Sequence, residues 1–191
     1  MTRIVHLNGQ WLPETEAKIS VFDRGFTFAD AVYEVTAVIG GKLVDYAGHL
    51  ARLKRSLGEL GIPMPCDEDA LLVRHREIVA RNALTEGLVY LQISRGAEDR
   101  EFVYGRELTP TFVMFTQARN VLGNPRIETG LKIATVPEGR WSRRDIKTVQ
   151  LLYPSLVKTA AHDKGADDVF LVEDGLITEA SGANAHIVDR N

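Results

Sequence analysis

The stretch VYEVTAVIGGKLVDY, residues 32–46, contains the longest β-strand signal in the chain and sets the fold class. Residues 32–39 are rich in β-branched and aromatic side chains, which favour a strand. Gly40 and Gly41 then reverse the chain, and KLVDY returns alongside the first strand. Two helices follow this hairpin in sequence, so we expect an α+β fold.

The two expected helices have apolar side chains at helical spacing. The first is expected at about 47–60 and ends near Gly61. The second begins after Asp67, a suitable N-cap, and runs to about Asn82. The side chains expected to face the core are Leu50, Leu53, Leu57 and Leu60 in the first helix, and Leu71, Leu72, Ile78 and Val79 in the second.

Further strand signals lie on both sides of this segment. IVHL and QWLP flank an Asn8-Gly9 turn, and strands are expected at 88–94 and 111–116. A second unit opens with LKIATV, forms a helix at about 154–164, continues with VFLV and LITE, and closes with a strand at 184–188. We expect a small α+β domain at 1–118, a linker at 119–125, and the start of a larger mixed-sheet domain at 126–191.

Composition excludes several classes of protein. The formal net charge is −3, which argues against general nucleic-acid binding because such proteins need a basic excess. The single cysteine, Cys66, cannot form an internal disulfide or a cysteine-rich metal site. No signal peptide or membrane span is evident, so we expect a soluble, cytoplasmic protein without membrane partners.

Common catalytic motifs are also missing. The five histidines show no metal-ligand spacing, so we expect no metal site, and His162 and His186 are expected to be structural or solvated. Lys147 has three arginines within the seven residues before it. A lysine is a nucleophile only when unprotonated, a state that nearby positive charge and burial favour. The plain alternative for this segment is a solvated basic loop.

Glu179 closes the strand LITE and precedes a run of small residues. Such residues let backbone N–H groups approach an anion closely. The plain alternative is a carboxylate that faces water at the end of a strand. Neither Lys147 nor Glu179 is decisive alone.

Four ordered motifs together are more specific. They are VFDRG (21–25) leading into DAVYE (30–34), HLARL (49–53), DIK (145–147) and ITEASGAN (177–184). With these motifs the chain resembles the fold-type IV pyridoxal 5'-phosphate (PLP) enzymes, that is, the class IV aminotransferases, and most closely the D-amino-acid aminotransferases. The resemblance covers essentially the whole chain.

The resemblance implies roles for individual residues. Lys147 is similar to the catalytic lysine that attaches PLP, and Glu179 to the carboxylate that pairs with the pyridine nitrogen. Arg52 is similar to the arginine that grips the cofactor phosphate, and Tyr33 to a tyrosine that lines the substrate pocket. Ser181, Gly182 and Ala183 match the small-residue loop beside the cofactor.

The resemblance also implies an activity: transfer of an amino group from a D-amino acid, such as D-alanine, to a 2-oxo acid, such as 2-oxoglutarate, by a homodimer. Arg100 matches an arginine that traps the substrate carboxylate, but Phe102 stands where a histidine is expected. A branched-chain L-amino-acid aminotransferase and an aminodeoxychorismate lyase remain alternatives. Family members continue past residue 191, so we expect the large domain to be incomplete. A truncated, non-catalytic homologue that keeps the motif residues but binds no cofactor is therefore the remaining alternative.

Overall fold

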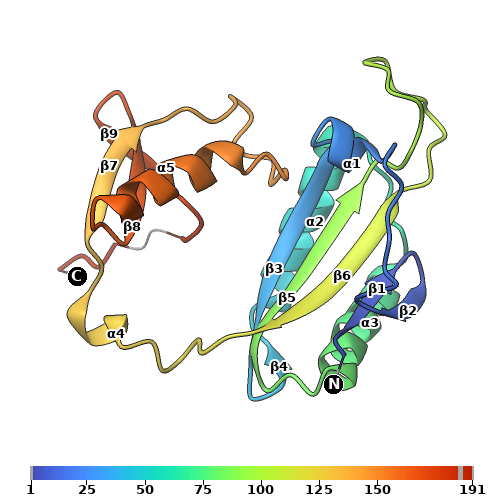
Figure 1. Ribbon diagram of the computed structural model, residues 1–191, viewed down its shortest axis with the longest axis horizontal. Helices are drawn as coiled ribbons and strands as arrows, with labels where there is room; N and C mark the ends of the chain where they lie inside the picture. Colours follow the sequence, from blue (N-terminus) through green and yellow to red (C-terminus); the bar gives the residue numbers. More distant parts are fainter. Residues whose placement is uncertain (1, 185–186, 191) are drawn as a thin grey trace. The chain divides into compact units, whose positions relative to one another are not determined.

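The structure, a computed structural model, describes residues 2–184 and 187–190 and divides into two compact units (Figure 1). The first unit comprises residues 1–123 and 145–149, and the second comprises residues 124–144 and 150–191. The segment 145–149 thus belongs by its contacts to the first unit. The domain limits expected from the sequence, with a linker at 119–125, stay a prediction.

The first unit is built on a six-stranded sheet with the order β2-β1-β6-β5-β3-β4, and all its strand pairs are antiparallel. Asn8 and Gly9 adopt left-handed φ angles of 49° and 89°, as a tight hairpin turn of type I′ requires. The predicted first hairpin and the long strand are therefore confirmed. The strands are β1 (Ile4–Leu7), β2 (Gln10–Pro13), β3 (Ala31–Ile39), β4 (Lys42–Leu43), β5 (Glu86–Ser94) and β6 (Thr111–Ala118).

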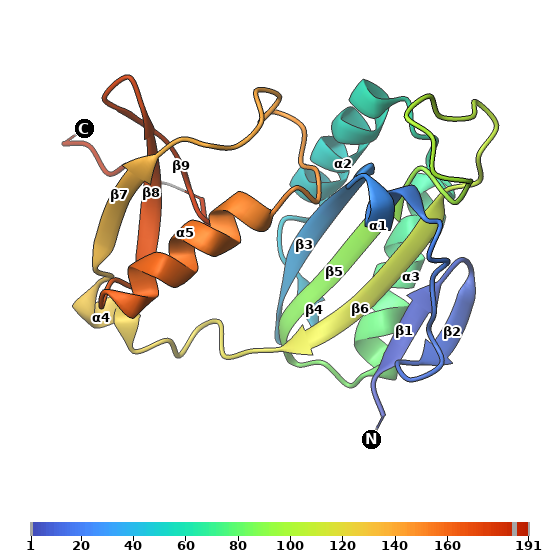
Figure 2. The same cartoon turned by 45° about the horizontal axis from the view of Figure 1, so that its top comes forward.

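Two long helices cover one face of this sheet, as both views show (Figures 1 and 2). They are α2 (Tyr46–Leu60) and α3 (Glu68–Arg81), and a single turn, α1 (Arg24–Thr27), precedes β3. The helix α2 ends at Gly61, whose φ of 62° suits glycine. The Asp67 carboxylate accepts a hydrogen bond from the Ala70 N–H and caps α3, as the sequence predicts.

The core of the first unit lies between the sheet and these helices. Along β5, the buried Val89, Leu91 and Ile93 alternate with the half-buried Tyr90 and Gln92, because successive side chains of a strand point to opposite faces. Of the residues expected to face inward, Leu53, Leu57, Leu71, Ile78 and Val79 are buried, whereas Leu50, Leu60 and Leu72 are half-buried.

The second unit contains a three-stranded sheet with the order β7-β8-β9. The strands β7 and β8 are parallel, and the helix α5 connects them and packs against β8 (Figure 2). Ala161, Val169 and Leu171 form its core. Its elements are α4 (Arg126–Thr129), β7 (Ile133–Pro137), α5 (Leu152–Asp163), β8 (Asp168–Glu173) and β9 (Leu176–Ala180).

The last strand expected from the sequence, at 184–188, is not found where the structure describes the chain. Ala185 and His186 lie outside the described residues, and Ile187 and Val188 are exposed and belong to no strand. Among the described helices, none is long and apolar enough to cross a membrane. The described residues also contain no group of three or more His, Cys, Asp or Glu side chains suited to a metal ion.

Candidate active site

Lys147 lies on a short extended segment that runs along the edge of β3. The Tyr33 N–H donates to the Lys147 carbonyl at 3.1 Å, and the Val149 N–H donates to the Ala31 carbonyl at 3.1 Å. The Lys147 N–H donates to the hydroxyl of Ser56, a fully buried residue of α2, at 3.2 Å. The backbone of Lys147 is therefore fixed by both the sheet and a helix.

The side chain of Lys147 meets the side chain of Tyr33. Its ammonium donates a hydrogen bond to the Tyr33 hydroxyl at 3.1 Å and lies 4.3 Å from the centre of the ring. The Tyr33 ring stacks on Tyr90 at 5.7 Å, and Tyr90 stacks on Phe115 at 4.7 Å. This aromatic row holds the tyrosine hydroxyl in a defined position beside the amine.

Arg52 is oriented by Glu34, the neighbour of Tyr33 on the opposite face of β3. Nε and Nη2 of Arg52 donate to the two carboxylate oxygens of Glu34 at 2.7 and 2.6 Å. His49, three residues before Arg52 on α2, contacts the same carboxylate through Nδ1 at 2.8 Å. The pair of Arg52 and Glu34 thus has the bidentate geometry of a strong ion pair.

Hydrogen bonding, rather than burial, decides the direction of the pKa shifts of Glu34 and Arg52. Burial raises the pKa of Glu34, but hydrogen bonds from Arg52 and His49 outweigh it, and the pKa lies below the usual value. Hydrogen bonding to Glu34 raises the pKa of Arg52, and the nearby Tyr33 hydroxyl adds to the rise. Tyr33 therefore lies within electrostatic range of Arg52, and its hydroxyl also accepts the hydrogen bond from Lys147.

Glu34 and His49 belong to two of the sequence motifs, but no role was predicted for either residue. Glu34 could have been identified from its place in the strand, because it shares the inward parity of Val32 and Thr36. A carboxylate at such a position must be paired. His49 and Arg52 are the matching partners, because residues three apart on a helix share a face.

In the second unit, Glu179 lies beside a network centred on Glu138. Arg140 donates to both carboxylate oxygens of Glu138, and its Nη1 lies 3.6 Å from Oε2 of Glu179. The hydroxyl of Thr178, the residue before Glu179, donates to Glu138 at 2.8 Å. Hydrogen bonds from Arg140 lower the pKa of Glu138 to about 2 despite its burial. A carboxylate that is ionised at neutral pH therefore fixes the arginine that approaches Glu179.

The loop expected beside the cofactor follows β9. Ser181 donates a hydrogen bond to Asp168, whose carboxylate also accepts from Lys158 at 2.8 Å. Gly182 and Ala183 continue as an exposed bend, and a Cβ at Gly182 would meet no atom within 4 Å. The base of this loop is therefore anchored, while its tip is open.

Arg100 lies in the loop after β5, among aromatic rings. Its guanidinium is 5.5 Å from the centre of the Phe28 ring and 5.6 Å from that of Phe102. Within the described residues, Arg100 forms no ion pair with a carboxylate. Phe102, which stands in place of the expected histidine, is 75% exposed and packs edge-on against Phe28 at 5.5 Å.

Two of the three arginines that precede Lys147, Arg140 and Arg144, form ion pairs within the second unit. Arg140 pairs with Glu138, and Arg144 donates to Glu173 at 2.7 Å. The alternative of a purely solvated basic loop does not describe them, because each guanidinium is held by a carboxylate. Lys147 itself belongs to the first unit.

The comparisons with known proteins fit this architecture. The family described as amino-transferase class IV matches residues 31–191. The D-alanine aminotransferase of Bacillus licheniformis is 34% identical over 189 residues, which are 98% of this chain and 66% of the relative. The chain thus spans about two thirds of the length of such relatives.

Two solved structures share the fold. The branched-chain amino acid aminotransferase of Escherichia coli has a TM-score of 0.83 at 18% identity, over 95% of this chain and 64% of that one. The 4-amino-4-deoxychorismate lyase of Pseudomonas aeruginosa has a TM-score of 0.73 at 22% identity, over 94% of this chain and 65% of that one. At these identities they show the fold alone.

The two units, one antiparallel and one mixed, define the α+β architecture of the fold-type IV enzymes, as the sequence predicts. The match over 31–191 is more specific than the fold, because it covers the segments that contain Tyr33, Arg52, Lys147 and Glu179. The chain belongs to the class IV aminotransferase family.

Proposed function

We propose that the protein is a PLP-dependent aminotransferase that moves the amino group of a D-amino acid, such as D-alanine, to a 2-oxo acid, such as 2-oxoglutarate. The main structural support is the hydrogen bond between the Lys147 amine and the Tyr33 hydroxyl, on a segment fixed to the edge of β3. The 34% identity to a D-alanine aminotransferase supports the substrate class.

The donor set of the chain fits PLP. Lys147 offers a primary amine for the aldehyde of PLP, and Glu179 a carboxylate for its ring nitrogen. Arg52 offers a guanidinium for its phosphate. The hydrogen bonds to Glu34 use Nε and Nη2 of Arg52, so among the described residues they leave Nη1 to bind an anion. Ser181, Gly182 and Ala183 would contribute an open loop with backbone donors.

When bound, PLP supplies an electron sink for the negative charge left on the substrate α-carbon after deprotonation. Nζ of Lys147 is the proposed general base that removes the α-proton of the amino acid. In the half-reaction with the 2-oxo acid, it would deliver a proton to the α-carbon. The Tyr33 hydroxyl holds this Nζ in place, because its ring is locked by stacking on Tyr90. Glu179 would keep a proton on the ring nitrogen, and Arg140 would orient Glu179.

Arg100 is the proposed partner of the substrate carboxylate. Its guanidinium forms no ion pair in the described part of the chain and is supported by the rings of Phe28 and Phe102. An arginine in this state can accept a carboxylate without first breaking an existing pair. Homodimer formation and a cytoplasmic location remain parts of the proposal that rest on the resemblance to the family.

The experiment is a visible absorption spectrum of the protein with PLP, before and after D-alanine or, in a separate sample, L-leucine, with 2-oxoglutarate added last to restore the starting spectrum. We expect a protein-bound PLP band that D-alanine changes, and the Lys147→Ala variant must lack it. A response to L-leucine alone would move the assignment to branched-chain substrates. Pyruvate release from aminodeoxychorismate without a 2-oxo acid would indicate a lyase. The absence of any PLP band would refute the proposed cofactor and activity for this chain.

A further inference from the structure

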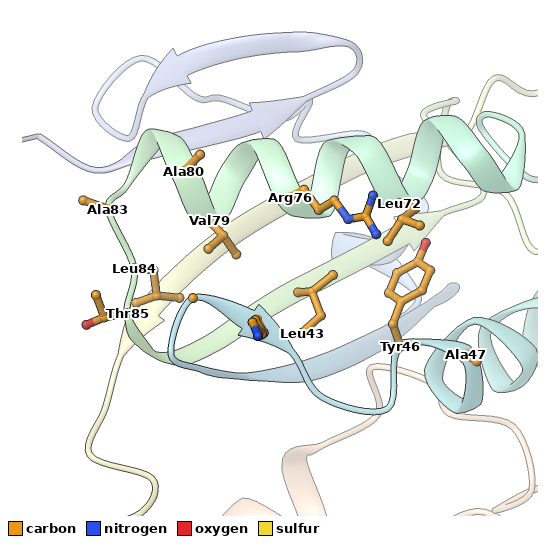
Figure 3. Close-up of a pocket in the computed structure, with 12 residues that line it drawn as sticks. Leu43, Tyr46, Ala47, Leu72, Arg76, Val79, Ala80, Ala83, Leu84 and Thr85 are labelled. Carbon is orange, nitrogen blue, oxygen red and sulfur yellow. The ribbon is translucent and has the colours of Figure 1, made fainter.

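A pocket of about 910 Å³ opens in the first unit, between α3, the turn that joins β3 to β4, and the start of α2 (Figure 3). Its volume falls in the range of small-molecule sites, which is about 300–1,000 Å³. None of the residues proposed above for catalysis or PLP binding lines it. The pocket is therefore separate from the proposed catalytic site.

The walls of the pocket are mostly apolar. Leu43, Leu72, Val79 and Leu84 supply its large side chains, and Figure 3 shows them around the space below α3. The space exists because the intervening positions have almost no side chain to fill it. These positions are Gly41, Ala47, Ala80 and Ala83.

One buried polar atom in this wall has no partner. The hydroxyl of Tyr46 is inaccessible to solvent and forms no hydrogen bond within the described part of the chain. Burial raises the pKa of Tyr46 to about 12, so the hydroxyl keeps its proton and remains a donor. A ligand acceptor would reach this hydroxyl once the half-buried Tyr46 side chain turns toward the pocket, and that turn is favoured because a buried hydroxyl without a partner costs about 1–3 kcal/mol.

Two cationic side chains lie in the wall of the same pocket. Arg76 and Lys42 line the pocket, and no carboxylate in the described residues forms an ion pair with either. In Figure 3 the guanidinium of Arg76 and the hydroxyl of Tyr46 point toward the same space beside Leu72. Glu68, an acid within electrostatic range of Tyr46, is already paired with Lys54.

We propose that this pocket binds a small monocarboxylate with an apolar body, such as a medium-chain fatty acid. The carboxylate would accept hydrogen bonds from Arg76 and Tyr46, with Lys42 adding charge, and the apolar body would lie against Leu72 and Val79. One negative charge matches the few donors available, and the remaining walls offer only apolar contact.

The experiment uses octanoate as the probe and isothermal titration calorimetry of the 191-residue protein as the readout. We expect octanoate to bind at least about tenfold more tightly than 1-octanol, which has the same apolar body without the charge. Arg76→Gln should weaken octanoate binding about tenfold and leave octanol binding unchanged. Equal binding of the acid and the alcohol would overturn the proposal.

Two further variants separate a pocket effect from a folding effect. Ala80→Leu should fill the space and abolish binding, and circular dichroism should show an unchanged fold, because residue 80 is on an exposed turn of α3. Arg74→Gln makes the same charge change two residues away, on the other side of the helix, and should leave binding intact. If octanoate does not bind and Ala80→Leu instead lowers the oligomeric state in light scattering, the pocket is a contact between copies and the proposal fails.

Discussion

The amine of Lys147 lies 3.1 Å from the hydroxyl of Tyr33, although 114 positions separate the two residues in the sequence. The contact depends on backbone hydrogen bonds that add residues 147–149 to the edge of β3. Because the Tyr33 ring is itself stacked on Tyr90, the hydroxyl is a fixed partner for the amine. This arrangement leads to a direct test.

Replacing the tyrosine by phenylalanine should slow transamination while PLP still binds. In Tyr33→Phe the ring and its stacking remain, and only the acceptor for the Lys147 amine is lost. We expect the rate with D-alanine and 2-oxoglutarate to fall about tenfold, the equivalent of one hydrogen bond. Tyr90→Phe is the matched control, because its hydroxyl binds Gln92 on the same strand. An equal loss in both variants would contradict a specific role for Tyr33.

The ion pair of Glu34 and Arg52 should contribute to the stability of the fold as well as to the proposed binding of the PLP phosphate. Glu34 is almost fully buried, so Arg52→Ala leaves its carboxylate with His49 alone. We expect the free energy of unfolding in urea to fall by about 1–3 kcal/mol. Lys54, on the same helix as Arg52, pairs with Glu68 of α3, and both side chains are half-exposed, so Lys54→Ala should cost about 0–1 kcal/mol. Similar losses in the two variants would show that burial of Glu34 is not decisive.

Arg140 should affect PLP binding through Glu179. Arg140→Gln removes the cation between Glu138 and Glu179, so Glu179 loses the group that orients it. We expect the dissociation constant for PLP, from an absorption titration, to rise on the order of tenfold. Arg144→Gln breaks the pair with Glu173 and a longer contact with Glu138, but it leaves Arg140 beside Glu179 and should have a smaller effect. A larger effect for Arg144 would place the orienting function elsewhere in the loop.

His75 should make the stability depend on pH. Burial lowers its pKa from 6.5 to about 4, although a hydrogen bond to the Leu71 carbonyl opposes the shift. Between these values the unfolded chain binds a proton that the folded chain excludes. Stability is therefore complete above pH 6.5, falls as the pH decreases toward 4, and loses nothing further from this group below 4.

The slope from one such histidine is about 1.4 kcal/mol per pH unit. His6, whose pKa burial also lowers to about 4, should contribute similarly. Urea unfolding from pH 7 down to 4 should therefore show a shallower slope in His75→Gln than in the unchanged protein. An identical slope would mean that the ring is protonated in the folded state.

Local signals in the sequence predict most of the fold. The Asn8-Gly9 turn and the Asp67 cap each define an element within one or two residues of its observed bounds. The single turns α1 and α4 are not predicted, because four residues are too few for a helical period to show. Elements with their own turn or cap are predictable, and short connecting turns are not.

The site is less predictable, because it depends on contacts between distant segments. Neighbouring arginines mark Lys147 as a candidate, but its pairing with Tyr33 is not predicted, since no local rule adds residues 147–149 to β3. The motif around Arg24 is recognisable in the sequence, but its residues have a structural role. There the Asp30 carboxylate accepts hydrogen bonds from Arg24 at 2.9 Å and Arg95 at 2.7 Å, which is a buried structural network. A motif alone does not separate such structural residues from catalytic ones.

The division into two units has a consequence for any attempt to cut the protein apart. The chain passes from one unit to the other three times, after Gly123, Arg144 and Val149. A cleavage between residues 123 and 124 would therefore leave the sheet and Tyr33 in one piece and Lys147 in the other. In the cleaved protein the amine would reach the tyrosine only if residues 145–149 of the second piece bound in trans to the edge of β3.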